Sequence, residues 1–207
     1  MPDKPWEKRC AYARKVAERD PRTKILIVCE GAKTEPNYFR GFPVDKEVVD
    51  VQIEGEGLNT DVLVERAMEM SRRAVALKRP YNQVWCVFDR DSFPGDSFNR
   101  ALQLARGNRI RVAYSNEAFE LWYLLHFVFH DTGVTRGKYC EMLTVRLGRE
   151  YQKNDPTMYE TLLSMQGVAT RNAGTLLSRY KPCNPAKDNP STTVHELVEE
   201  LGRFVPE

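Results

Sequence analysis

The chain has 207 residues, and its 31 Lys and Arg nearly balance its 29 Asp and Glu, which gives a formal net charge of +2. A hydrophobic share of 42% and a charged share of 29% are ordinary for a soluble globular protein. This balance does not indicate a nucleic-acid binder, but it is compatible with one that carries a local basic face. No apolar run approaches the roughly 20 residues that a membrane span needs.

The N-terminus and the cysteines indicate the cellular compartment. The first residues lack the apolar stretch of a secretory signal. The five cysteines are odd in number and scattered, and no two are spaced as CxxC, which argues against a disulfide framework and against a zinc site. We therefore expect a reduced, cytoplasmic protein without membrane contacts.

The first elements alternate between strand and helix. Residues 1–23 are polar and rich in Lys and Arg, and we interpret them as a basic arm. The apolar run KILIVCEG, which ends at Gly31, is typical of a strand buried on both faces. TEPNYFRGF predicts a helix that Thr34 would cap, with Pro36 in the first turn, where proline is tolerated.

The same alternation continues to about residue 130. VVDVQIEG alternates apolar and polar residues, as a strand does, and residues 58–78 carry apolar side chains at helical spacing. QVWCVFDRD is a second buried strand, followed by the short helix SFNRALQLARG, which Gly107 would close. IRVAYSN predicts a fourth strand, and EAFELWYLLHFVF predicts a strongly apolar helix.

This order predicts an α/β fold, in which helices flank a parallel sheet over residues 24–130. Residues 131–207 are expected to form a helical extension packed on that core. KPCNPAKDNP is the clearest loop, because its three prolines cannot lie in a continuous helix, and VHELVEELGRF is the helix that follows it.

Two of the predicted buried strands end in acids: Glu30 follows the first, and Asp89 and Asp91 follow the third. Ligands of open α/β sheets bind beyond the carboxyl ends of the strands. Asp89 and Asp91 are two residues apart, so in extended chain they point the same way. If the strands are neighbours, three carboxylates converge and repel one another, and Mg²⁺ or Mn²⁺ would relieve that repulsion. The alternative is that these are ordinary strand-end acids in turns.

Four segments resemble the RloB-like family, in the order in which that family carries them: ILIVCEGAKTEPNYF, VWCVFDRDSF, SNEAFELWYLLHF and NPSTTVHELVEEL. The family occurs beside restriction–modification and abortive-infection genes and is grouped with Toprim domains. The resemblance implies a Toprim-like sheet, with one Glu after the first strand and a DxD after a later strand. Glu30, Asp89 and Asp91 occupy those positions. It also implies that the Asp pair holds Mg²⁺ near the scissile phosphate, while the Glu is a further ligand or the general acid/base.

The resemblance extends to two further acids. Glu120, on the apolar helix, matches an acid of the family and is a candidate metal or water ligand, with a helix-dipole partner as the alternative. Glu35 also matches a family position and could support the ligands, although a structural role is favoured. Glu117 stands where the family usually has proline, so no role is transferred to it.

Three basic residues are candidate phosphate contacts. Lys33 lies in the turn after Glu30, with a solvated lysine as the alternative. Lys153 and Arg171 lie in segments that resemble the family's helical tail, and a nuclease needs such charges because phosphate neutralisation dominates nucleic-acid affinity. His126 and His130 are four apart and would lie on one helical face, but Phe127 stands where an HExxH motif needs Glu, so a packed or surface histidine pair is favoured.

The leading hypothesis is a Mg²⁺- or Mn²⁺-dependent Toprim-type endonuclease that cuts DNA or RNA in bacterial or archaeal antiviral, abortive-infection defence. An ATPase encoded nearby is a candidate partner. One alternative is a phosphatase of the haloacid-dehalogenase type, because FDRDSF contains DxD after a strand; such enzymes normally carry the motif on the first strand, and Glu30 would be unexplained. The other is a binding module that holds a metal and a nucleotide without turnover.

Overall fold

The computed structural model describes residues 22–58, 60–90 and 95–206. Nearly all of the expected basic arm, residues 1–23, lies outside the described residues, as does Asp91. No helix in the described part is long and apolar enough to span a bilayer.

A sheet of four parallel strands forms the centre of the molecule, in the order β2-β1-β3-β4. The strands are β1 (Thr23–Cys29), β2 (Val49–Gly55), β3 (Gln83–Arg90) and β4 (Arg111–Asn116). Helices flank this sheet, which confirms the predicted α/β class. They are α1 (Thr34–Arg40), α2 (Thr60–Ala76), α3 (Gly95–Gly107), α4 (Glu120–Leu125), α5 (Arg136–Leu147), α6 (Met158–Leu162), the 3₁₀ turn η1 (Leu163–Met165), α7 (Gln166–Ser178) and α8 (Val194–Gly202).

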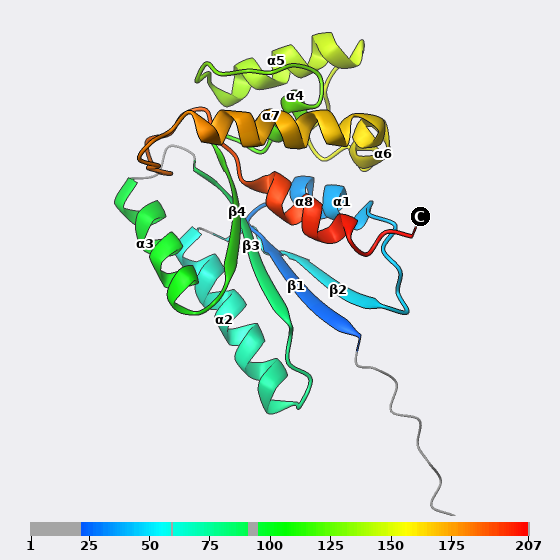
Figure 1. Cartoon of the computed structure of the whole chain (residues 1–207), viewed down its shortest axis with the longest axis vertical. Coiled ribbons are helices and arrows are strands. Elements are labelled where there is room, and N and C mark those ends of the chain that lie inside the picture. Colours follow the sequence, from blue (N-terminus) through cyan, green and yellow to red (C-terminus); the bar gives the residue numbers. More distant parts are fainter. Residues whose placement is uncertain (1–21, 59, 91–94, 207) are drawn as a thin grey trace, which may run out of the picture.

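Both faces of the sheet are covered, as the continuous apolar runs predicted. Alternate residues of β1 point to opposite faces: Leu26 and Val28 pack with α2 and α3, whereas Ile25 and Ile27 belong to the larger core on the other side. Figure 1 shows α2 and α3 on one face and α1 and α8 on the other. Each face therefore has its own hydrophobic core.

The segment after β4 adds a further helical layer. Helices α5 and α7 pack on α4, and α6 packs on α1 (Figure 1). The chain then returns to the sheet, where Thr192 forms an isolated antiparallel bridge with Ser115 and the N–H of Thr193 donates to the carbonyl of Tyr114 at 2.9 Å. This return places α8 against β4.

One local prediction is wrong. The apolar segment after β4 contains only the short α4, and the chain has left the helix before His130, so His126 and His130 do not share a helical face. The prediction that α3 closes at Gly107 is confirmed, although Gly107 does not adopt the left-handed conformation of a glycine C-cap. Arg109 adopts it instead, with φ 58°, while the side-chain amide of Asn108 donates to the carbonyl of Leu104 at 2.8 Å.

Candidate metal centre

The connections of the sheet diverge between β1 and β3. From β1 the chain passes through α1 to β2 on one side, whereas from β3 it passes through α3 to β4 on the other side and over the opposite face. Open α/β folds bind their ligands beyond the carboxyl ends of the strands at such a switch point. Glu30 directly follows β1 and Asp89 is next to last in β3, so the strand order places both acids there.

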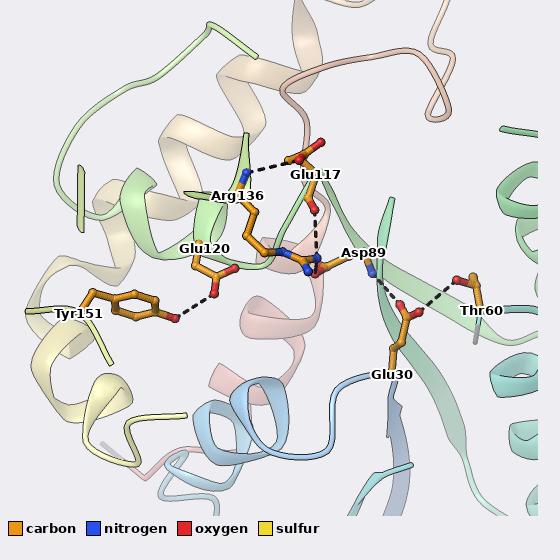
Figure 2. A network of polar contacts seen from close by, with 7 residues as sticks. All are labelled: Glu30, Thr60, Asp89, Glu117, Glu120, Arg136 and Tyr151. Atoms are coloured by element: carbon orange, nitrogen blue, oxygen red, sulfur yellow. Dashed lines mark hydrogen bonds and ion pairs between the residues drawn. The ribbon is translucent and has the colours of Figure 1, made fainter. Parts of the chain in front are cut away.

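Glu30 is held through both of its carboxylate oxygens. The backbone N–H of Asp89 donates to Oε2 at 3.1 Å, and the Thr60 hydroxyl donates to Oε1 at 3.4 Å (Figure 2). Its own N–H donates to the carbonyl of Val87 at 2.8 Å, which continues the β1–β3 ladder by one residue. Glu30 and Asp89 therefore lie next to each other, joined through the Asp89 backbone, while the Asp89 carboxylate points toward Arg136 (Figure 2). Convergence of the three carboxylates on one cation stays a prediction.

Asp89 has a largely buried carboxylate that is only partly neutralised. Its side chain is only 14% exposed; Oδ2 pairs with the guanidinium of Arg136 at 3.3 Å, and Oδ1 is buried without a hydrogen-bond partner among the described residues. Burial raises the pKa of Asp89 well above its usual value, the negative charges of Glu35, Glu120 and Glu30 raise it further, and Arg136 lowers it. Ionised Asp89 therefore needs more positive charge than Arg136 supplies.

Glu35 belongs to the same cluster, although a structural role was favoured for it. It is 6% exposed, and its Oε2 has no hydrogen-bond partner in the described part of the chain. Burial raises its pKa, its own backbone N–H lowers it, and the charge of Glu120 raises it. A Cβ added at Gly31 would lie 2.0 Å from Glu35 Oε2, so glycine at position 31 makes room for this carboxylate. Close approach of a phosphate to Gly31 stays a prediction.

Glu120 is the first residue of α4 and is only 2% exposed. The hydroxyl of Tyr151 donates to its Oε1 at 3.1 Å (Figure 2). Its charge contributes to the raised pKa values of Asp89 and Glu35, so it faces the same cluster.

Of the predicted phosphate contacts, Lys153 acts on the acids electrostatically, because its charge lowers the pKa of Glu35. The loop that carries Lys153 is anchored on α1: the Thr34 hydroxyl donates to Asn154 Oδ1 at 2.9 Å, and the Asn37 amide donates to the Asn154 carbonyl at 3.1 Å. Thr34 is therefore not the N-cap that was expected; the cap residue is Lys33, and its side chain makes no capping bond.

The other two predicted phosphate contacts are less tied to the cluster. Lys33 is exposed at the start of α1. Arg171 is exposed on α7, and within the described residues no contact joins it to the acids. The sequence pattern gave no means of ranking these residues, because their distances from the acids depend on loops.

The sequence reasoning missed Arg136 and gave no role to Glu117. Arg136, the first residue of α5, donates its backbone N–H to Glu117 Oε1 and its Nη2 to the Glu117 carbonyl, both at 3.3 Å (Figure 2). Glu117 adopts a left-handed conformation with φ 69°, and its N–H donates to the carbonyl of Arg90 at 2.8 Å. Thr135, whose hydroxyl accepts from the N–H of Lys138, could have indicated that a helix starts at Arg136, but nothing local places that helix beside Asp89.

These side chains fit a divalent cation in part. Two of the buried carboxylate oxygens, Asp89 Oδ1 and Glu35 Oε2, have no partner among the described residues, and carboxylate oxygen is the ligand that Mg²⁺ and Mn²⁺ prefer. Yet no three acid, His or Cys side chains of the described residues, which leave out Asp91, are grouped so that they could hold a metal ion. Glu30 and Asp89 thus supply only part of a ligand set.

Comparison with known proteins decides the family. The family model described as RloB-like protein matches residues 25–201. The chain belongs to the RloB-like family. No curated protein and no solved structure matches it significantly. In this RloB-like protein the matched region contains every acid of the cluster and also Arg136 and Tyr151.

Proposed function

We propose that this RloB-like protein is a Mg²⁺- or Mn²⁺-dependent endonuclease of the Toprim type that cuts phosphodiester bonds of DNA or RNA. The observation that carries the proposal is the joining of Glu30 and Asp89 at the switch point of the sheet, together with the buried, unpartnered Oδ1 of Asp89. Asp91 is proposed as a further ligand from its place in the DxD motif. A role in antiviral abortive-infection defence, a cytoplasmic location and an ATPase partner are proposed from the family resemblance alone.

The bound cation would stabilise the negative charge that develops on the phosphate. Asp89 would hold it through Oδ1, which no described group occupies. The carboxylate of Glu30 is oriented in advance by the Asp89 N–H and the Thr60 hydroxyl, so it can act as a further ligand or take a proton without reorganisation. Lys153 would contribute positive charge toward the nucleic-acid backbone.

Incubation of the full chain with plasmid DNA, single-stranded DNA and transfer RNA, with and without Mn²⁺ or Mg²⁺, tests this function. We expect cutting that depends on the metal and is lost in Asp89→Asn. Asp50→Asn is the matched control, because Asp50 is an exposed acid at the amino end of β2. Retained cutting in Asp89→Asn would overturn the site.

Two other outcomes would replace the proposal. Mn²⁺ binding measured by calorimetry, without cutting of any of these substrates, would assign a binding module. A covalent phosphate trapped on Asp89 would assign a phosphatase, in which the first Asp of the DxD is the nucleophile.

A further inference from the structure

Arg136 is the cation that the structure places on Asp89. Its Nη2 lies 3.3 Å from Asp89 Oδ2 and also donates to the carbonyl of Glu117. Its side chain is nevertheless 38% exposed, so the guanidinium lies between a largely buried carboxylate and solvent. A group in that position can reach a ligand that arrives from outside.

The backbone of Arg136 is fixed independently of its side chain. Its N–H is held by the carboxylate of Glu117, and the hydroxyl of Thr135 caps the helix that it begins. The guanidinium can therefore change partner by side-chain rotation alone, while α5 stays in place.

A divalent cation bound at Asp89 would replace the guanidinium of Arg136 as the group that neutralises this carboxylate. The cation neutralises Asp89 and its acidic neighbours and repels the guanidinium, because the two carry charge of the same sign. The released guanidinium could then donate two parallel hydrogen bonds to two oxygens of a phosphate, a geometry for which arginine is well suited.

We propose that Arg136 exchanges partners, neutralising Asp89 in the metal-free protein and bonding to a phosphodiester of the nucleic acid once a divalent cation occupies Asp89. The exchange rests on the proposed function and adds to it the residue that couples metal binding to phosphate recognition. It makes Arg136 a substrate-binding residue that serves as a counter-ion until the metal arrives.

The first test is calorimetry of the full chain at pH 8 with Mn²⁺ alone. Arg136→Gln removes the competing charge, so we expect Mn²⁺ to bind about fivefold to tenfold more tightly than in the wild type. Arg146→Gln, the same charge change on the exposed end of α5, should leave the affinity unchanged. Thermal melts of each variant establish that it is folded, and Arg136→Lys, which retains the charge, serves if Arg136→Gln does not fold: it should bind Mn²⁺ no more tightly than the wild type.

The second test measures binding of a fluorescent single-stranded oligonucleotide in Ca²⁺ and in EDTA, over a range of salt concentrations. In Ca²⁺, Arg136→Gln should weaken binding and reduce the salt slope by about 0.7 to 0.9, the value of one phosphate contact. In EDTA, where Arg136 stays on Asp89, the substitution should change binding little. A residue that is only structural, or only part of a basic surface, would give the same loss in both conditions.

The outcomes distinguish a failure of the Arg136 exchange from a failure of the proposed metal-dependent function. Equal Mn²⁺ affinity in the wild type and Arg136→Gln, with binding lost in Asp89→Asn, overturns the exchange and keeps the metal site. Oligonucleotide binding weakened equally in Ca²⁺ and EDTA also overturns it. No Mn²⁺ binding by any variant overturns the proposed function and the exchange together.

Discussion

The backbone N–H of Asp89 donates a hydrogen bond to Glu30 Oε2 across 3.1 Å, and this bond joins the acids of two neighbouring strands. It fixes the carboxylate of Glu30 beside an aspartate that is mostly buried and only partly neutralised. The stability of the protein should therefore depend on how that negative charge is balanced.

Asp89→Asn should stabilise the metal-free protein at neutral and alkaline pH. Burial and the neighbouring carboxylates raise the pKa of Asp89 well above its usual 3.8, so ionising Asp89 costs free energy in the folded state. The contribution of protonated Asp89 to stability is full below 3.8, its usual pKa, and is lost as the pH rises through the raised pKa of the folded state. Because Asn does not titrate, we expect its Tm to exceed that of the wild type by roughly 2–4 °C at pH 8, about the effect of 1 kcal/mol in a chain of this length. Thermal melts between pH 5 and pH 9 check this, and an unchanged pH slope in Asp89→Asn would contradict it.

Glu30→Gln should weaken metal binding while leaving the fold intact. The Gln carbonyl can still accept from the Asp89 N–H and its amide can donate to the Thr60 hydroxyl, but a ligand charge is lost. We expect Mn²⁺ affinity to fall by about 10–100-fold, with little change in Tm. Calorimetry is the measurement, and the exposed Glu47→Gln is the control. Equal loss in both variants would show that Mn²⁺ responds only to net charge.

Gly31→Ala should destabilise the protein through Glu35. The added methyl group would lie 2.0 Å from Glu35 Oε2 and would displace a buried side chain. We expect a loss of about 1–3 kcal/mol in the free energy of unfolding, measured in urea. In the Glu35→Ala background the same change should cost much less, because the two residues are coupled. Equal costs in the two backgrounds would place the strain elsewhere.

Tyr151→Phe should destabilise the protein, because the buried carboxylate of Glu120 loses a hydrogen-bond donor. The change removes the hydroxyl that donates to Glu120 Oε1, which leaves a buried carboxylate oxygen without that bond. A loss of about 1–3 kcal/mol in the free energy of unfolding is expected. A double-mutant cycle with Glu120→Ala measures the coupling, and additive losses would contradict the pairing.

His126 should remain neutral in mildly acidic solution. Burial lowers its pKa to about 4, and its Nδ1 lies 2.9 Å from the carbonyl of Trp122. Neutral His126 thus contributes stability that is full above 6.5, its usual pKa, and is lost as the pH falls through about 4. NMR titration of its ring protons is the measurement, with the unfolded chain as reference; a folded-state midpoint near 6.5 would contradict the prediction.

The sequence by itself determined the α/β class and the position of two acids. The apolar runs that became β1 and β3 could be assigned from local pattern, because a strand buried on both faces must be apolar throughout. Glu30 and Asp89 follow from the same pattern, since parallel strands present their carboxyl ends at one edge. The placement of Asp91 lies outside the described residues and stays a prediction.

Only the tertiary structure decided what surrounds those acids. Arg136 lies 47 positions after Asp89 in the sequence, and it reaches the carboxylate because α5 packs on α4 and Glu117 turns the chain after β4. Lys153 approaches Glu35 through a loop anchored by Asn154 on α1. Such contacts depend on loop conformation and long-range packing, whose residues carry no periodic signal, whereas a buried strand carries one along its whole length.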